Sequence, residues 1–139
     1  MGIIGVKNGI EHIDANIVIR LIVGDDFKNY QKAKKLISRK NKTFVFEDAV
    51  MMEVVFVLSK IYKYSREAVS AGIDFIASFE NIYFNKGLIE DALNLFVDHP
   101  KLSFVDCYLA AITTISNEKP LWTFDKALAK KLPSITREL

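Results

Sequence analysis

The most informative stretch of the sequence is KLSFVDCYLAAITTISNEKPLWTFDKAL, residues 101–128. Its apolar residues follow a helical period over Ser103–Ser116, and the short apolar run over Pro120–Phe124 is typical of a strand. Asp106 stands near the start of the predicted helix, and Asp125 directly follows the predicted strand. This stretch therefore places two carboxylates at the ends of secondary-structure elements.

The same alternation of helix and strand runs through the rest of the chain. Periodicity predicts further helices over Ile17–Ile22, Phe27–Arg39, Ala49–Tyr62, Arg66–Phe79, Leu88–Val97 and Lys126–Lys131. Asp48 and Ser65 are predicted N-caps, and Gly24 marks a helix end. Short β-type runs predict strands over Ile10–Ile13, Thr43–Phe46, Asn81–Phe84 and Ser134–Thr136. The alternation predicts an α/β fold, a three-layer α/β/α sandwich with a mostly parallel central sheet.

The composition describes a globular protein with little net charge. A length of 139 residues predicts one domain, residues 1–139, in which residues 1–9 form a loose lead-in. Half of the residues are hydrophobic and the mean hydropathy is +0.15, which excludes a disordered chain. The net charge is only +2, so any binding of nucleic acid depends on local clusters of Lys and Arg.

The few reactive residues narrow the class of protein. The single cysteine, Cys107, cannot form a disulfide within the chain, which favours a reducing, cytoplasmic location. Two histidines and one cysteine make a zinc site unexpected. The N-terminal residues show no signal-peptide pattern, and no apolar run is long enough to span a bilayer.

Two candidate acids follow predicted strands. Asp14, or its neighbour Asn16, can cap the next helix, and for Asp14 alone this structural role is favoured about two to one. Asp125 can likewise cap the short helix Lys126–Lys131. In parallel sheets, however, functional sites form at the carboxyl ends of the strands, where both acids stand.

Two more candidate acids belong to predicted helices. Asp106 comes three residues after Ser103, which matches a capping-box pattern, and for Asp106 alone this capping role is favoured. Glu53 has apolar neighbours on both sides, and a carboxylate is rarely buried there without a partner. Its side chain could point to solvent, pair with a Lys or face a cation.

The four acids would form a metal site if they converge. Mg²⁺ and Mn²⁺ prefer oxygen ligands, which carboxylates and waters supply. Two such ions about 4 Å apart can activate water and hold the leaving oxygen during attack on a phosphate. This chemistry needs acids and no histidine, which suits a chain with only two histidines.

The order of these signals resembles the PIN domain, and within it the VapC-type toxins of prokaryotic toxin–antitoxin pairs. The resemblance is carried by Asp14-x-Asn16, by Glu53 in an apolar helix, by Ser103-Phe104-x-Asp106 with Leu109-Ala110-Ala111 after it, and by Thr123-Phe124-Asp125. It extends from Ile13 to about Ile135. The segment before Asp14 is longer than is usual in the family.

The resemblance implies a metal-dependent endoribonuclease that hydrolyses RNA phosphodiesters, the toxin of a toxin–antitoxin pair. It implies that Asp14, Glu53, Asp106 and Asp125 are the catalytic residues and hold Mg²⁺ or Mn²⁺. Asn16 and Thr123 match polar positions that support this cluster. The family also implies a homodimer and an antitoxin whose tail lies in the active-site groove.

Two other functions remain open at this point. A non-catalytic RNA- or protein-binding domain would keep the fold without needing four convergent acids. A phosphohydrolase with Asp14 as covalent nucleophile is the less favoured alternative, because that chemistry usually wants a second Asp where this chain has Asn16.

Two surface features are expected from the sequence. A basic stripe recurs along one helix face at Lys28, Lys32, Lys35 and Arg39; it is either an ordinary solvated face or an RNA-binding surface, at about even odds. A homodimer is also indicated by large apolar residues that exceed the needs of one small core, namely Phe44, Phe46, Met51, Met52, Phe56 and Tyr62.

Overall fold

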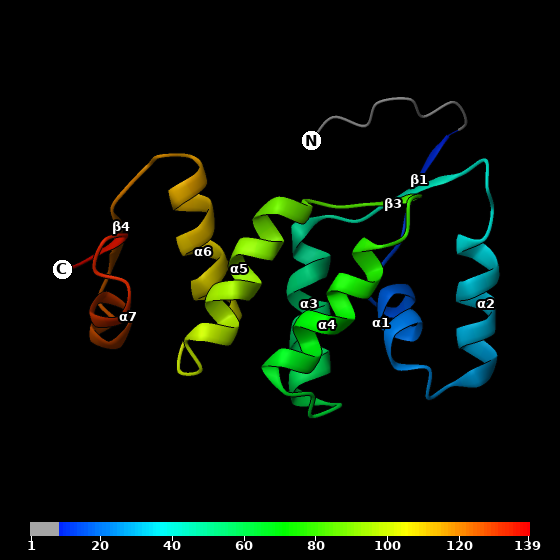
Figure 1. The fold of residues 1–139 in the computed structure, drawn as a ribbon, viewed down its shortest axis with the longest axis horizontal. Helices are drawn as coiled ribbons and strands as arrows, with labels where there is room; N and C mark the ends of the chain where they lie inside the picture. The colour runs from blue at the N-terminus through cyan, green and yellow to red at the C-terminus, as the bar shows by residue number, and fades with distance from the viewer. Residues whose placement is uncertain (1–8) are drawn as a thin grey trace. The chain divides into compact units, whose positions relative to one another are not determined.

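The computed structural model describes residues 9–139, so the predicted lead-in lies outside the described residues except for Gly9. The chain divides into two compact units, Met1–Lys86 (unit 1) and Gly87–Leu139 (unit 2). Figure 1 shows their helices and strands in chain order. None of the described helices is long and apolar enough to cross a membrane.

Unit 1 contains a parallel three-stranded sheet with four helices. Its elements are β1 (Ile10–His12), α1 (Ala15–Val23), α2 (Phe27–Ile37), β2 (Thr43–Val45), α3 (Asp48–Lys60), α4 (Arg66–Ala77) and β3 (Ile82–Tyr83). The strand order is β1-β2-β3. In the register, Ile10 pairs with Thr43 and Phe44 with Ile82.

The central strand β2 supplies the middle of the unit 1 core. Phe44, Val45 and Phe46 are all buried, as expected for a strand covered on both faces. The ring of Phe46 stacks on that of Phe84, with centroids 4.8 Å apart. Full burial of one such side chain contributes about 1.5–3 kcal/mol to stability. The buried side chains of the central strand therefore contribute much of the stability of the sheet.

Polar residues at the helix starts explain most of the helix boundaries. The side chains of Asp14, Asp26 and Ser65 each accept a hydrogen bond from the third residue after them and cap α1, α2 and α4. Gly24 ends α1 with a left-handed φ of 70°, a conformation that glycine adopts at little cost.

The predicted cap of α3 is wrong. Asp48 is the first residue of the helix and Glu47 takes the N-cap position, without a side-chain cap hydrogen bond. An acid in the first turn still interacts favourably with the helix dipole, so Asp48 stabilises the start of α3 from the first helical position instead of the N-cap position.

Unit 2 contains three helices and a parallel pair of strands. Its elements are α5 (Lys86–Asp98, which begins at the last residue of unit 1), α6 (Phe104–Ile115), β4 (Leu121–Thr123), α7 (Lys126–Lys131) and β5 (Thr136–Glu138). Leu121 pairs with Thr136 and Thr123 with Glu138. The rings of Phe96 and Phe104 meet edge to face between α5 and α6.

The last strand begins later than predicted. The final strand was predicted to end at Thr136, whereas β5 begins there. The backbone N–H groups of Ile135 and Thr136 both donate to the carbonyl of Leu132, which makes a turn of the residues before the strand. All strand pairs in the described residues are parallel, as the alternation of helices and strands predicts.

Candidate functional site

The four predicted acids are divided equally between the two units. Asp14 and Glu53 belong to unit 1, and Asp106 and Asp125 to unit 2. Taken unit by unit, residues 9–86 and 87–139 contain no group of three or more His, Cys, Asp or Glu side chains that could hold a metal ion. Neither unit alone contains more than two of the predicted ligands.

Asp14 lies at the carboxyl end of β1. The Ile13 N–H donates to the carbonyl of Val45, which continues the β1–β2 pairing up to the acid. Asp14 Oδ1 then accepts the N–H of Ile17 at 3.2 Å, so the structural role as N-cap is confirmed. The side chain is exposed, and its Oδ2 accepts no hydrogen bond from the described residues. Capping therefore leaves one oxygen of Asp14 available to a ligand.

Glu53 lies in the middle of α3 with its side chain exposed. Met51, Val54 and Val55 beside it are buried, which anchors this part of the helix. The exposure of Glu53 fits two of the three orientations left open by the sequence, toward solvent or toward a cation. Glu53 forms no salt bridge within the described part of the chain.

Asp106 occupies the first turn of α6 and is half-buried. The cap of this helix is Ser103, whose Oγ accepts the backbone N–H of Asp106 at 3.1 Å. Ser103 is thus confirmed as the N-cap of α6, and the Asp106 carboxylate takes no part in that hydrogen bond. An acid that is partly enclosed and not used by the helix start is a candidate ligand.

Asp125 is held in place by bonds on both sides. Its Oδ1 accepts the N–H groups of Ala127 at 2.9 Å and Leu128 at 3.1 Å, which caps α7. Its own N–H donates to Thr123 Oγ1 at 2.9 Å. Thr123 therefore fixes the turn in which Asp125 lies.

The donor chemistry of the four acids fits a hard divalent cation. All four offer carboxylate oxygens, with no thiolate or imidazole among them, and Mg²⁺ and Mn²⁺ prefer such donors. Three of the four are exposed and the fourth is half-buried, so none has to be released from a core to reach an ion.

A cleft of about 530 Å³ lies between α1 and α2 in unit 1. It brings together two predicted residues, Asn16 and Lys32, and its other lining residues are Ile17, Arg20, Asp26, Asn29, Ala33 and Leu36. Arg20 and Asn29 were not predicted from the sequence as lining residues of a site. Arg20 interrupts the apolar spacing of α1, which is the signal that could have identified it.

Arg20 is fixed at the edge of this cleft. Its Nη1 donates to Asp25 Oδ1 and its Nη2 to the Tyr62 hydroxyl, both at 2.6 Å. The hydrogen bond to Tyr62, and then the charge of Asp25, raise the pKa of Arg20 above its usual value. At the same end of the cleft, hydrogen bonds from Asn29 lower the pKa of Asp26. The cleft therefore keeps fixed charges of both signs.

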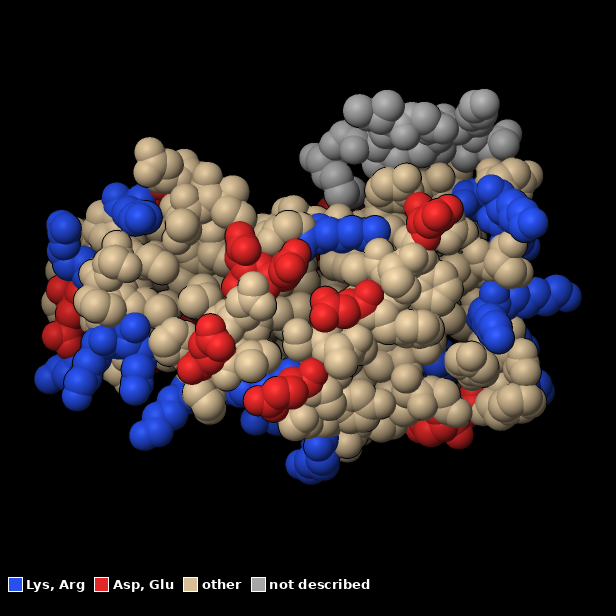
Figure 2. Space-filling model, in the orientation of Figure 1, with Lys and Arg blue, Asp and Glu red and all other residues tan. Residues whose placement is uncertain are grey.

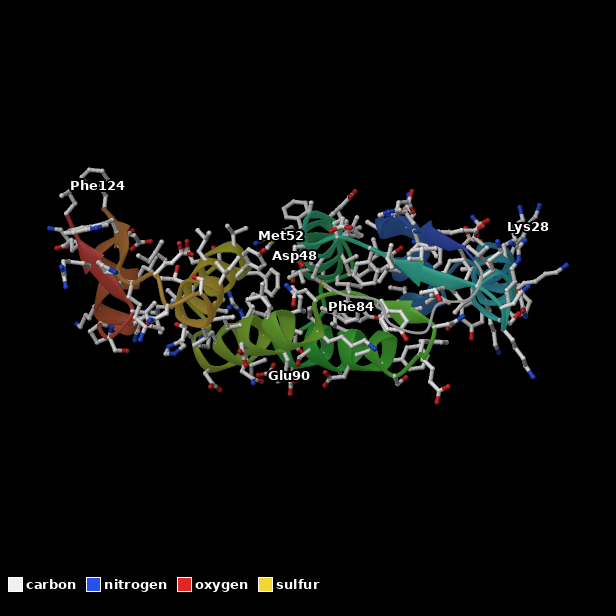
Figure 3. The ribbon with its side chains drawn as sticks, turned by 90° about the horizontal axis from the view of Figure 1, so that it is seen from above. Lys28, Asp48, Met52, Phe84, Glu90 and Phe124 are labelled. Carbon is white, nitrogen blue, oxygen red and sulfur yellow. The ribbon has the colours of Figure 1, made fainter. Side chains whose placement is uncertain are left out.

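The basic stripe is exposed but shorter than predicted. Lys28, Lys32 and Lys35 lie on α2, and Figure 3 shows Lys28 pointing away from the ribbon. Arg39 lies beyond Ser38, the C-cap of the helix, and its N–H donates to the Leu36 carbonyl in a turn. We therefore restrict the helical stripe to the three lysines.

Half of the residues behind the dimer prediction are core residues. Phe44, Phe46 and Met51 are buried within unit 1. Phe56 is exposed, and Met52 and Tyr62 are half-buried. Only three of the six side chains therefore remain at least partly exposed and could contribute to a dimer interface.

Comparison with known proteins gives one family. The model of the PIN domain matches residues 12–131, a range that includes all four acids. No curated protein sequence matches the chain significantly. A similar solved structure is that of Mycobacterium tuberculosis VapC20, a sarcin-ricin loop cleaving toxin. It is 18% identical, the match covers 88% of this chain and 95% of that one, and the TM-score is 0.41.

Proposed function

This chain belongs to the PIN domain family, and on that premise we propose that it is a metal-dependent endoribonuclease. PIN domains are typically nucleases, and the family match also confirms the predicted α/β/α fold with a mostly parallel sheet. The observation that supports the proposal most is the state of the four acids. Each is exposed or half-buried, and none forms a salt bridge in the described residues.

We propose that Asp14, Asp106 and Asp125 hold the metal and that Glu53 completes the cluster or orients the attacking water. A divalent ion bound there would supply Lewis acidity at the phosphate and make a coordinated water more acidic. Asp14 and Asp125 would contribute from rigid positions, because each has one oxygen fixed by a helix start. Thr123 would keep Asp125 in place, and Asn16 would lie beside Asp14 in the first turn of α1.

The biological setting belongs to the same proposal. We propose a VapC-type toxin that acts as a single domain in the cytoplasm, forms a homodimer and is neutralised by an antitoxin. Phe56, an exposed aromatic residue on α3, is one of the residues from which the homodimer was inferred. The neighbouring gene is the quickest check on the antitoxin, since it should encode a small DNA-binding protein with a disordered tail.

The direct test is cleavage of a structured RNA by the purified protein. We expect cleavage with Mg²⁺ or Mn²⁺ and none in EDTA, because the four acids need a cation to act on a phosphodiester. Gel electrophoresis of an end-labelled RNA measures this. Binding without cleavage under all metal conditions would favour the non-catalytic alternative.

The lysines of α2 provide a second prediction. If Lys32 and Lys35 contact phosphates, replacing both with Ala weakens RNA binding and flattens its salt dependence. Each lost contact to a single strand lowers the slope of log K against log salt by about 0.7, so we expect a decrease of about 1.4. Binding measured by fluorescence anisotropy at several salt concentrations gives the slope.

The matched control for this prediction removes two other exposed lysines, Lys60 and Lys101. It changes the net charge equally but leaves α2 intact. If both double variants change the slope by the same amount, the stripe is an ordinary solvated face.

A further inference from the structure

Two exposed aromatic side chains, Trp122 in the middle of β4 and Phe124 directly after it, belong to unit 2. Trp122 is 55% exposed and Phe124 is 78% exposed, the largest exposure among the large hydrophobic side chains of the described residues. Figure 3 shows Phe124 projecting away from the ribbon at the end of unit 2. Single exposed apolar residues are common on protein surfaces, but here two large exposed rings belong to residues only two positions apart.

A cation lies over one of these rings. Trp122 pairs with Arg137 across β4 and β5, and the guanidinium carbon of Arg137 lies 5.4 Å from the centre of the indole ring. The guanidinium and the indole therefore form an exposed cation–aromatic pair in unit 2. Such planar groups, aromatic or guanidinium, are the ones on which proteins stack unpaired RNA bases.

The chain around these rings is basic. Residues 119–139 contain five Lys and Arg residues against two acids, Asp125 and Glu138; the basic residues are Lys119, Lys126, Lys130, Lys131 and Arg137. In the view of Figure 2, blue side chains gather over the part of unit 2 that contains α7. An anionic ligand with flat, apolar parts complements this combination of charge and rings.

We propose that Trp122, Arg137 and Phe124 form a stacking platform for unpaired bases of single-stranded RNA. The bases stack on Phe124 and on the Trp122–Arg137 pair, while Lys126 neutralises a phosphate. Stacking of this kind tolerates any base, because every base has a flat face. The platform selects RNA with unstacked nucleotides, such as a loop, over a continuous duplex.

The position of the platform also relates it to cleavage, and this step depends on the proposed function. Phe124 immediately precedes Asp125, one of the proposed metal ligands. A base stacked on Phe124 would therefore belong to a nucleotide close to the phosphodiester that is cut. The protein would then cut next to an unstacked base without reading its identity.

The single tryptophan of the chain makes the platform directly observable. We expect a single-stranded RNA oligonucleotide, added in EDTA, to quench Trp122 fluorescence through stacking. An oligonucleotide of the same length that lacks bases should bind more weakly and quench little. Phe124→Leu should weaken binding of the normal oligonucleotide about tenfold, within the range for loss of one base stack.

Phe124→Tyr is the matched control, because Tyr keeps the aromatic ring. Leu is also large and apolar but has no ring. The Tyr variant should bind like the parent, and all variants should melt at the parent temperature. Because EDTA prevents cleavage, this result is independent of whether the protein is a nuclease. The proposal is overturned if Leu binds as tightly as Tyr, if RNA leaves Trp122 fluorescence unchanged, or if the parent binds both oligonucleotides equally.

Discussion

Asp106→Asn is expected to remove nearly all RNA cleavage, at least about 100-fold. Loss of residues that only support a metal ligand already costs about 10–100-fold, and Asp106 is proposed as a ligand itself. The substitution keeps the shape of the side chain and removes its charge. It should leave the helix intact, because Ser103 caps α6 through its own Oγ.

Because Ser103 caps α6, replacing Asp106 tests its role in cleavage separately from the stability of the helix. The circular dichroism of Asp106→Asn should match that of the parent, and its Tm in EDTA should lie at or above that of the parent, so that lost activity reflects lost chemistry. Asp91→Asn, an exposed acid on α5 in the same unit, is the control with the same change in charge. If Asp106→Asn cuts RNA as fast as the parent, the acid has been assigned wrongly.

Local structure could be predicted from the sequence because its causes are local. Helix starts follow from Asp14, Ser65, Ser103 and Asp125, which act on amide groups within three residues of themselves. The parallel pairing follows from alternating strands and helices. The errors also have local causes: the turn at Leu132 delays β5.

Contacts between distant residues could not be predicted in the same way. Arg20 and Tyr62 are 42 positions apart, and nothing in either neighbourhood indicates their hydrogen bond. The dimer prediction had the same weakness. It counted Phe44 and Phe46 as more than one core needs, whereas both are buried in unit 1.

The candidate site combines both kinds of information. The separate positions of Asp14, Asp106 and Asp125 could be predicted from the sequence, because each lies at a strand end or a helix start. Joint action of the acids of unit 1 and unit 2 involves residues about 100 positions apart in the sequence, so local patterns do not predict it. This shared action is the central claim of the proposed function.

Mn²⁺ is therefore expected to stabilise the parent strongly, and the acids of both units should be needed for it. At about 100 times its Kd, a ligand adds about 2.7 kcal/mol, which corresponds to roughly 5–10 °C in Tm for a chain of this size. Asp14→Asn changes unit 1 and Asp125→Asn changes unit 2. Asn is itself a good N-cap, so both variants keep their helix starts and lose only charge.

The deciding measurement is the Tm of the parent, Asp14→Asn and Asp125→Asn in EDTA and in Mn²⁺. Four carboxylates that share a site repel one another without metal, so the variants should melt at or above the parent in EDTA. In Mn²⁺ the parent should gain the full shift and each variant less than half of it. Equal Mn²⁺ shifts in all three proteins, or none in any, would contradict a metal centre shared by the two units.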